Sequence, residues 1–343
     1  MTIALDATYS LGEELSGVGL YSREILAGLA AAHPEERFEF CYRLHRYRRP
    51  AGMDLPGNVR RRLLAGPLGP RSADLFHGLN QRLPRLRMRR TVATFHDLFV
   101  MTGEYSTAEF RARFIGQARD AASRADIIIA VSAFTAGQVV ELLGVDTGRV
   151  RVVHHGIRRL EFPPPVERQK VILNVGAIQK RKNIARLVEA FEAVDNDWRL
   201  VLAGGTGYGA QEILDRIASS PASNRISVLG YVPPLDLARW YAGAAVFAFP
   251  SLDEGFGMPL IEAMAAGTPA ITSRRSALPE VAGDAAMLVD PENTGELAQA
   301  LCELTRNADL RQQLATRGLA RAHQFTWEKA VRETWEIYQE LLR

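Results

Sequence analysis

Short apolar runs rich in β-branched residues alternate along this chain with longer amphipathic stretches. Because strands of a parallel sheet are buried on both faces, this alternation predicts an α/β protein with helices on both sides of each sheet. In the first half, strands are predicted at Ile3–Asp6, Arg37–Tyr42, Asp74–His77, Thr91–Phe95 and Asp126–Val131. In the second half, they are predicted at Lys170–Val175, Trp198–Ala203, Ile226–Leu229, Ala245–Phe249 and Pro269–Ser273. The amphipathic stretches of the first half predict helices at Val18–Ala32, Ala108–Arg124 and Ala133–Leu143.

The two halves are separated by Phe162–Val166, whose three consecutive prolines predict a stiff, extended linker. A length of 343 residues accommodates two domains of about 150 residues each. We therefore expect two doubly wound domains, an N-terminal one at residues 1–162 and a C-terminal one at residues 163–325. The last segment, residues 326–343, has aromatic and aliphatic residues at near-helical spacing, which predicts a helix with one buried face.

Composition narrows the class of protein. Hydrophobic residues make up 47% and charged residues 24%, which excludes disordered and fibrous proteins. Cys41 and Cys302 lie far apart, so no disulfide framework is expected and a reducing, cytoplasmic environment fits. The sequence contains neither an apolar run of membrane-spanning length nor the pattern of a secretory signal. We expect a cytoplasmic protein whose contact with a membrane, if it has one, is peripheral and at the inner face.

Charge is distributed unevenly. The net charge of +3 combines +7 in residues 1–160 with −4 in residues 161–343. The segment Arg43–Arg90 carries 13 arginines, no lysine and only two aspartates, a local charge of +11, and its glycines and prolines predict loops. Three interpretations remain open, namely a solvated face, a patch for anionic lipid beside a lipid-linked acceptor, and a nucleic-acid site. No nucleic-acid partner is expected, because beyond Tyr42 and Tyr47 the arginines are not interleaved with aromatic side chains that could stack on bases.

Polar and glycine residues follow several predicted strands. In parallel sheets, ligands bind beyond the carboxyl ends of the strands, and a cleft between the domains is the expected site. The residues that follow strands are His96–Asp97, Gly176, Gly204–Gly205 and the long string that begins at Pro250. The sequence contains no GxxxxGK[ST] loop, and no GxGxxG follows the first strand, which argues against P-loop and dinucleotide-binding enzymes.

The string after Pro250 predicts a diphosphate site. Gly255–Pro259 runs into an amphipathic stretch, so the N–H groups of Phe256–Met258 would lie at a positive helix end. Arg181–Lys182 precede a predicted cap at Asn183 and could add contacts to the same phosphates, although a solvated helix start explains them equally well. Glu254 and Glu262 are spaced so that both carboxylates could face one ligand and bind the hydroxyls of a sugar and a ribose.

The string Pro250–Pro269 resembles the signature of the retaining, GT-B-fold glycosyltransferases of family 4, also called glycosyltransferase group 1. Within this family, the chain resembles the mannosyltransferases. The mark of this family is a Glu-x7-Glu spacing with Gly-Phe-Gly between the two glutamates. The resemblance continues at Ser16–Gly19, Phe95–Asp97, Ala125–Ser132, His155–Gly156, Val175–Gly176, Lys182–Asn183, Val201–Gly205, Leu229–Val232 and Ser273–Glu280. It implies two Rossmann-like domains with an interdomain cleft and a C-terminal helix that returns to the N-terminal domain.

The resemblance also implies roles in donor binding. Glu262 would bind the ribose hydroxyls, and Glu254 would contact the transferred sugar, surrounded by the backbone of Phe256–Met258. Lys182 would hold the diphosphate and stabilise the leaving group without a metal. Many family members have an arginine directly after the Val-Gly pair, where this chain has Ala177, so Arg181 is the expected substitute.

Further donor and acceptor contacts are implied on both domains. Tyr231 and Val232 would receive the base, and Gly205 would allow the nucleotide to approach the backbone closely. In the first half, Gly17 and Gly19 would lie beside the donor phosphates, with Gly17, Val18 and Asp97 on the acceptor side. His96 would touch the sugar; together with Asp97 it is a candidate base, although a front-face route with proton transfer to the departing phosphate is favoured.

The function that these observations predict is transfer of a hexose from a nucleotide-diphosphate sugar to a glycan or lipid-linked acceptor, with no metal and no further cofactor. The Arg-Lys-Asn start favours mannose from GDP-mannose. A UDP- or ADP-sugar donor, a nucleotide-sugar epimerase, and a non-catalytic protein that binds lipid surfaces or nucleic acid remain alternatives. Asp195–Asp197 resembles a metal motif but precedes a strand and is interpreted as a turn, and His154–His155 are interpreted as structural.

Overall fold

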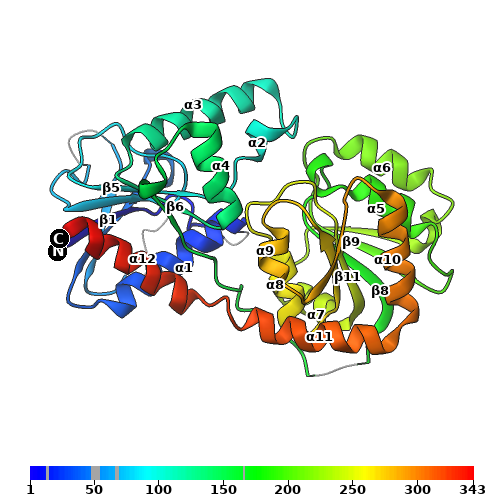
Figure 1. Cartoon of the computed structure of the whole chain (residues 1–343). Helices are drawn as coiled ribbons and strands as arrows, with labels where there is room; N and C mark the ends of the chain where they lie inside the picture. The colour runs from blue at the N-terminus through cyan, green and yellow to red at the C-terminus, as the bar shows by residue number, and fades with distance from the viewer. Residues whose placement is uncertain (13–14, 48–54, 66–68, 165–166) are drawn as a thin grey trace. The chain divides into compact units, whose positions relative to one another are not determined.

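The chain is described by a computed structural model that covers residues 1–12, 15–47, 55–65, 69–164 and 167–343. It forms two compact units, and Figure 1 shows that each consists of a sheet with helices packed on it. Unit 1 consists of Met1–Thr102, Ala108–Gly156 and Thr326–Arg343. Unit 2 consists of Gly103–Thr107 and Ile157–Phe325. The main segment of unit 2 thus begins at residue 157, a few residues before the proline-rich segment at which the sequence placed the boundary.

Unit 1 is built on a parallel sheet in the strand order β3-β2-β1-β4-β5-β6-β7 among the described residues. The strands are β1 (Thr2–Asp6), β2 (Arg37–Tyr42), β3 (Val59–Leu63), β4 (Leu75–Gly78), β5 (Thr91–Phe95), β6 (Ile127–Ala130) and β7 (Val150–Val152). In the register, Ile3 of β1 lies opposite Phe38 of β2 on one side and Leu75 of β4 on the other. All three side chains are almost fully buried, as expected for the centre of a two-sided sheet.

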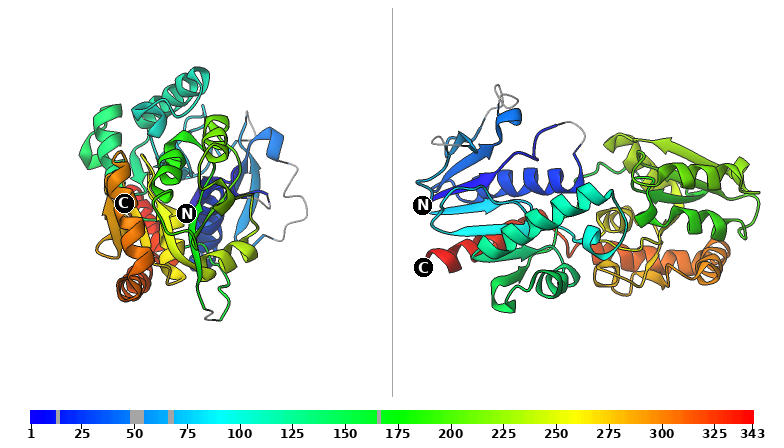
Figure 2. Two further views of the ribbon diagram at one scale, coloured as in Figure 1. Left: turned by 90° about the vertical axis from the view of Figure 1, so that its right-hand side faces the viewer. Right: turned by 90° about the horizontal axis from the view of Figure 1, so that it is seen from above.

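Helices cover both faces of this sheet, as Figures 1 and 2 show. On one face lie α1 (Gly17–Ala32) and α12 (Trp327–Leu342), which contact each other. On the other lie α2 (Phe99–Thr102), α3 (Ala108–Arg124) and α4 (Ala133–Leu143). Trp335 and Tyr338 of α12 are buried in unit 1, which confirms the predicted return of the C-terminal helix. Short 3-10 helices are present at Leu44–Arg46 and Thr147–Arg149.

Unit 2 repeats the doubly wound pattern on a sheet with the order β10-β9-β8-β11-β12-β13, also parallel throughout its described residues. Its strands are β8 (Gln169–Val175), β9 (Arg199–Ala203), β10 (Ile226–Gly230), β11 (Ala244–Phe249), β12 (Ala270–Ser273) and β13 (Ala286–Val289). Its helices are α5 (Ile184–Phe191), α6 (Ala210–Ala218), α7 (Pro234–Gly243), α8 (Met258–Ala265), α9 (Leu278–Ala282), α10 (Thr294–Arg306) and α11 (Ala308–Ala322), with 3-10 helices η4 (Lys180–Lys182) and η5 (Ser223–Arg225). Two Rossmann-like units confirm the predicted fold class.

The structure corrects part of the predicted element pattern. β3 forms inside the arginine-rich segment that was predicted to be loops, and its three central residues are the arginines Arg60–Arg62. It is an edge strand, where charged side chains are tolerated because one side of the strand is unpaired. The short strands β7 and β13 were also missed. β7 has three residues with a central arginine, and β13 has only four residues, most of which are half-buried. Arg48, Arg49, Asp54 and the end of the proline-rich linker lie outside the described residues.

The strand orders locate the ligand-binding edges. Along the chain, the sheet of unit 1 grows first from β1 towards β3 and then from β4 in the opposite direction, so the order reverses between β1 and β4. In unit 2 the reversal lies between β8 and β11. Loops diverge from a doubly wound sheet at such a reversal and leave a crevice at the carboxyl ends of the strands. The residues that follow β8 and β11 are therefore the first to inspect in unit 2.

Candidate functional site

A buried carboxylate with two basic partners lies beside this reversal in unit 2. Glu254 comes from the loop after β11, whereas Arg181 and Lys182 come from η4, in the connection after β8. Lys182 Nζ donates to Glu254 Oε1 at 2.6 Å, and Arg181 Nη1 lies 2.8 Å from Glu254 Oε2. All three side chains are about 10% exposed or less. The structure thus brings together three residues that the sequence predicted for the site, across 72 positions of chain.

The charges of this trio control its protonation. Burial alone would raise the pKa of Glu254, but the charges of Arg181 and Lys182 and their hydrogen bonds outweigh burial and lower the pKa to about 2. The carboxylate is therefore ionised at neutral pH, and the trio carries one net positive charge. Lys182 Nζ also lies 4.6 Å from the centre of the Phe249 ring, a cation–π arrangement that helps to hold the ammonium group.

Backbone and amide contacts join the two loops that carry the trio. The Asn183 side chain donates to the carbonyl oxygens of Pro250 and Pro291, at 3.1 and 2.6 Å. The N–H of Leu252 donates to the carbonyl of Arg181 at 2.9 Å. Asn183 was predicted to cap a helix; it does occupy the N-cap position of α5, but its side chain ties loops together and does not cap. These bonds fix the positions of the cations relative to Glu254.

Helix α8 begins at Met258, after Gly255–Gly257, close to where the sequence predicted a helix end. Gly257 is the N-cap residue, with φ of 104°, and a Cβ there would lie 2.7 Å from Leu278 Cδ2, so a glycine is required. Pro259 lies in the first turn, and no side chain caps this end. Phe256 is buried edge-on against Phe325, with ring centres 5.6 Å apart, and Met258 is also buried. The helix therefore presents backbone N–H groups where an anion could bind.

Glu262 lies on α8 but has partners different from those of Glu254. Tyr241 donates its hydroxyl to Glu262 Oε2 at 2.9 Å, and Arg158 Nε lies 3.1 Å from Oε1 in an ion pair that is not aligned as a hydrogen bond. The residue is only 2% exposed. Burial raises the pKa of Glu262, although the Arg158 charge and the Tyr241 hydrogen bond partly offset this effect. The two signature carboxylates thus occupy separate environments within unit 2.

This environment makes a prediction about pH. The unfolded chain ionises a glutamate at a pKa of about 4, whereas the folded protein holds the Glu262 proton to higher pH. The contribution of Glu262 to the free energy of unfolding therefore falls as pH rises from about 4 through the raised pKa. The Glu262→Gln variant keeps the shape but lacks this titration. The free energy of unfolding of this variant, measured in urea from pH 4 to pH 8, is expected to increase relative to that of the wild type as pH rises. A constant difference across this range would contradict the raised pKa.

Glycines bring the ends of β8, β9 and β10 together. A Cβ on Gly204 would lie 2.1 Å from the carbonyl oxygen of Gly176, and the N–H of Gly204 donates to the carbonyl of Gly230 at 2.7 Å. Around Gly205, in contrast, a Cβ would meet no atom within 4 Å. The space beside Gly205 is therefore open, as expected for a backbone that a ligand approaches closely.

The predicted base-binding residues lie after β10. Tyr231 is 51% exposed, and together with Val232 it lines a pocket of about 460 Å³. The other walls of this pocket come from α7 and from the amino end of β8. An exposed aromatic ring at the rim of a pocket can stack on a base. Among the described residues, no hydrogen bond links Tyr231 directly to Glu254, Arg181 or Lys182.

In unit 1, the predicted site residue His96 is held in a buried cluster. Its Nε2 donates to the carbonyl of Leu79 at 3.0 Å, so Nδ1 is the acceptor and receives the Nε2–H of His155 at 3.4 Å. Tyr21 packs edge-on against both imidazole rings. Burial lowers the pKa of His96 to about 4, despite the opposing hydrogen bond to Leu79. With both nitrogens engaged, His96 is a weak candidate for a general base. His155 is buried and stacks on the His96 ring.

The histidine cluster predicts acid sensitivity. His77 is bonded to Thr94 and Tyr338, and burial lowers its pKa to about 3. When folding lowers the pKa of a base, the folded protein loses stability as pH falls below the pKa that the base has in the unfolded chain. For His96 the loss between pH 7 and pH 5 is about 2 kcal/mol. We expect the urea midpoint of His96→Gln to change less over this interval than that of the wild type; equal pH slopes would contradict the prediction.

The remaining residues predicted in unit 1 lie at the start of α1 and after β5. Ser16 caps α1 by accepting the N–H of Gly19, and a Cβ on Gly19 would lie 2.9 Å from the carbonyl oxygen of Tyr9. Gly19 is therefore required by packing, whatever it binds. Gly17 is exposed, and Val18 and Asp97 are half-buried. Gly17, Val18 and Gly19 lie at the start of the helix that follows β1, and Asp97 lies two residues after β5, so the connections that carry them leave the carboxyl edge of the unit 1 sheet.

Sequence reasoning missed Arg158, Tyr241 and Ser276. Arg158 follows the His155–Gly156 motif, but only the folded chain shows that it reaches Glu262. Tyr241 lies on α7 in no recognisable motif, and Ser276 Oγ accepts the backbone N–H of Glu254 at 3.1 Å. Within the described part of the chain, no cluster of three or more His, Cys, Asp or Glu residues has the arrangement of a metal site. None of the described helices is both long and apolar enough to cross a membrane.

Two family models match the chain. The model described as Glycosyltransferase Family 4 matches residues 9–159, and the model described as Glycosyl transferases group 1 matches residues 158–321. Among curated proteins, the chain is 28% identical, over 375 aligned positions, to O-antigen chain mannosyltransferase B of Escherichia coli. This alignment covers 97% of the present chain and 98% of the relative.

Solved structures with the same fold include sucrose-phosphate synthase from Thermosynechococcus elongatus, with a TM-score of 0.81 and 22% identity. That comparison covers 99% of this chain and 98% of the other. HepE from Anabaena, in complex with UDP-glucose, has a TM-score of 0.74 and 18% identity, with coverage of 99% and 98%. At these identities the similarity establishes the fold alone, and it agrees with the fold class that the sequence predicts.

Proposed function

Because the chain belongs to the family 4 glycosyltransferases, whose two family models match its two halves, we propose that it is a retaining enzyme that transfers mannose from GDP-mannose to a glycan or lipid-linked acceptor. The observation that carries this proposal is the buried trio of Glu254, Arg181 and Lys182 beside the open N-terminus of α8. Similarity to a mannosyltransferase over nearly the whole of both chains supports the choice of sugar.

In this proposal the donor binds to unit 2. Its diphosphate contacts Lys182, Arg181 and the N–H groups of Gly257 and Met258, where the net positive charge of the trio favours an anion. The ribose hydroxyls bind Glu262, so Arg158 has to share or release that carboxylate. The base lies against the backbone of Tyr231–Val232, next to the open space at Gly205.

Catalysis then depends on negative charge that develops on the departing diphosphate. Lys182 and Arg181 stabilise this charge, and because Glu254 already fixes their positions, little reorganisation is needed during the reaction. Glu254 also accepts a hydrogen bond from the transferred sugar. We favour front-face retention, in which the acceptor oxygen attacks the anomeric carbon and passes its proton to the departing phosphate. Neither a metal nor a further cofactor is needed in this scheme.

The residues of unit 1 serve the sugar and the acceptor. The start of α1, at Gly17–Gly19, approaches the donor phosphates and the acceptor. His96 contacts the transferred sugar without acting as a base, since its pKa of about 4 and its two hydrogen bonds make it a poor proton acceptor. Asp97 lies on the acceptor side. An acceptor carried on a lipid would bring the enzyme to the inner face of the membrane.

Thermal shift and product assays with GDP-mannose, UDP-glucose and ADP-glucose test this function. We expect GDP to stabilise the protein most, transfer to be insensitive to EDTA, and NMR of the product to show the anomeric configuration of the donor. A UDP-sugar is the second candidate, because the solved neighbour HepE binds UDP-glucose. A nucleotide sugar isomerised without acceptor would indicate an epimerase, and stabilisation by no nucleotide would refute the enzyme.

A further inference from the structure

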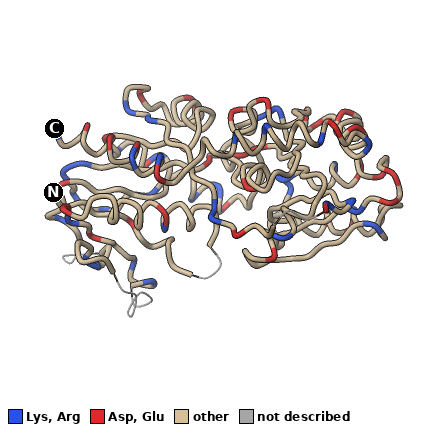
Figure 3. Tube along the Cα trace, turned by 90° about the horizontal axis from the view of Figure 1, so that it is seen from below, with Lys and Arg blue, Asp and Glu red and all other residues tan. Residues whose placement is uncertain are grey.

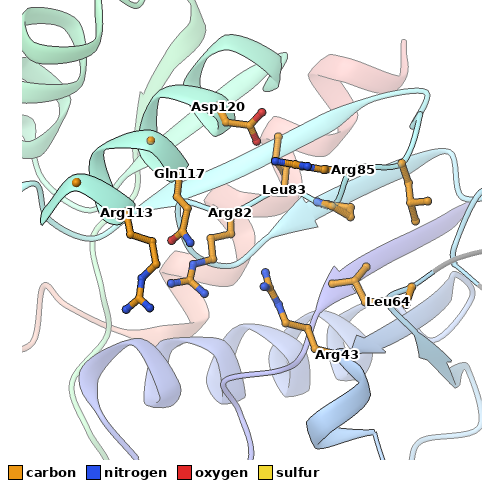
Figure 4. Close-up of a pocket in the computed structure, with 13 residues that line it drawn as sticks. Arg43, Leu64, Arg82, Leu83, Arg85, Arg113, Gln117 and Asp120 are labelled. Atoms are coloured by element: carbon orange, nitrogen blue, oxygen red, sulfur yellow. The ribbon is translucent and has the colours of Figure 1, made fainter. Parts of the chain in front are cut away.

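Unit 1 contains a large pocket that none of the predicted site residues lines. Its volume is about 730 Å³, within the range of small-molecule sites. The walls come from residues that follow three strands of the sheet, namely Arg43 after β2, Leu64 after β3 and the segment Arg82–Leu86 after β4. β2 and β3 are neighbours, and β1 separates them from β4. Gln117 and other residues of α3 complete the pocket, as Figure 4 shows. The pocket therefore lies at the carboxyl edge of the sheet, where ligands of doubly wound folds bind.

Four guanidinium groups line this pocket. Arg43, Arg82 and Arg85 belong to the arginine-rich segment, and Arg113 comes from α3, which is distant in sequence. The one carboxylate in the lining, Asp120, is ion-paired with Arg124 on the next turn of α3. Figure 4 shows Arg43, Arg82 and Arg113 reaching into the same space from different elements. We call this cavity, with its four arginine side chains, the arginine pocket.

The guanidinium groups have few partners within the protein. Arg43 Nη2 lies 3.5 Å from Asp6 Oδ2, a long contact, and Arg113 lies over the Phe110 ring. Among the described residues, the side chains of Arg82 and Arg85 form no ion pair. The Nε atoms of Arg43 and Arg82 are buried without a hydrogen-bond partner in the part of the chain that the structure describes. Buried donors without partners are unfavourable, and an anionic ligand would satisfy them.

Several other described arginines of this segment have partners outside the pocket. Arg62 pairs with Glu39, Arg89 pairs with Asp74, and Arg46 donates to the carbonyl of Leu11. These arginines are therefore held by separate partners. Figure 3 shows Lys and Arg positions on many separate stretches of the chain trace. Among the described residues, three arginines of this segment meet Arg113 in one pocket, whereas Arg89 and Arg90 line a different pocket together with Asp74.

We propose that the arginine pocket binds a phosphate or diphosphate group of the acceptor. This inference rests on the proposed glycosyl transfer, since it concerns the acceptor of that reaction. Planar guanidinium groups bind phosphate oxygens in pairs, and a wall with four arginines and no lysine suits a ligand with at least two negative charges. The donor phosphates are assigned to the trio in unit 2, so the enzyme has two separate phosphate sites. The acceptor is a sugar phosphate or the diphosphate of a lipid-linked sugar.

Calorimetric titration with inorganic diphosphate tests the pocket directly. The wild type is expected to show two binding sites, one of which the Lys182→Ala variant weakens. The double variant Arg82→Gln, Arg85→Gln should weaken the other by about 100-fold, at about tenfold for each guanidinium group removed. Arg87→Gln is the matched control, because Arg87 is exposed on the same loop but does not line the pocket. Arg85→Gln alone changes an exposed side chain, which separates binding from any folding defect of the double variant.

Two results would overturn the proposal. One is loss of all diphosphate binding in Lys182→Ala, and the other is unchanged diphosphate affinity in both Arg85→Gln and the double variant. Failure of the proposed function is a different result, since a protein that binds diphosphate in the arginine pocket but neither binds GDP nor transfers a sugar would contradict the activity alone. Conversely, normal GDP binding and donor hydrolysis with no arginine-dependent site would contradict the pocket alone.

The source of the phosphate is decided with two further probes. Glucose 1-phosphate represents a soluble acceptor, and phosphatidylcholine vesicles that contain polyprenyl diphosphate represent a lipid-linked one. Arginine-dependent binding of either probe supports the pocket and identifies the source. Sedimentation with phosphatidylglycerol vesicles that is as strong as with polyprenyl diphosphate, and equal in the double variant, would indicate a general anionic surface and contradict the proposal.

Discussion

Replacing Glu254 with glutamine is expected to lower turnover by at least about 100-fold, with a smaller change in donor KM. The amide keeps the size of the side chain but loses the charge that holds Arg181 and Lys182 at 2.6 to 2.8 Å. Both cations then lie in a buried site without a counter-charge, and the transferred sugar loses a charge-assisted hydrogen bond. Removal of one preorganised electrostatic interaction in an active site typically costs about 100- to 1000-fold in rate.

The same substitution is expected to destabilise the fold. Breaking a buried ion pair by removing one partner costs about 3–5 kcal/mol, because the other charge is left uncompensated. Saturating GDP should restore part of this stability in the variant, since its diphosphate supplies negative charge at the same place. Steady-state kinetics and urea unfolding with and without GDP measure both effects.

Glu212→Gln is the matched control for Glu254→Gln. Glu212 pairs with Lys180 at 2.9 Å, but both side chains are exposed, at 74% and 44%. Exposed pairs contribute less than about 1 kcal/mol, so turnover and stability should stay near the wild-type values. If Glu254→Gln behaved like Glu212→Gln in both measurements, the trio would be neither the catalytic nor the electrostatic centre of unit 2.

Replacing Lys182 with alanine is expected to raise the donor KM and the GDP dissociation constant by about 10- to 100-fold and also to lower turnover. The ammonium group is the proposed contact to the diphosphate, and a hydrogen bond between charged groups contributes about 1.5–3 kcal/mol. In the variant, Glu254 keeps Arg181 as its counter-charge, so the pKa of Glu254 rises from about 2 but the carboxylate stays ionised at neutral pH.

Lys180→Ala provides the control for this second substitution. Lys180 belongs to the same short helix, η4, but its side chain points to solvent and pairs with Glu212. Titration calorimetry with GDP should find unchanged affinity in Lys180→Ala. An equal decrease of affinity in the two lysine variants would show that general positive charge, and not the buried ammonium group, binds the donor.

The success of sequence reasoning in unit 2 has a local physical basis. The run after β11 contains a glycine in a left-handed conformation, a first-turn proline and an amphipathic helix, and these features are encoded by neighbouring residues. The strands of both sheets are largely apolar because they are buried on both faces, so most were predicted within a few residues. β3 was missed because an edge strand with three central arginines carries no such pattern.

The sites depend on contacts between residues distant in sequence. Glu254 and Glu262 are each buried with partners of their own, and Arg158 reaches Glu262 from 104 positions away. His96 was a candidate base until the fold showed Leu79 and His155 at its two nitrogens. No local signal predicts such pairs, because they form only when separate loops meet at one edge of a sheet.

The amino-acid sequence by itself determined the α/β class, the two-unit organisation and the family signature, since apolar periodicity and glycine or proline conformation act over a few residues. Only the tertiary structure decided how the charges are used. It buried Arg181 and Lys182 around one carboxylate, and it divided the arginine-rich segment so that three of its members join Arg113 around a pocket. Electrostatic interactions depend on distance and burial. Both are set by the order of the strands in each sheet and by the positions at which their loops meet.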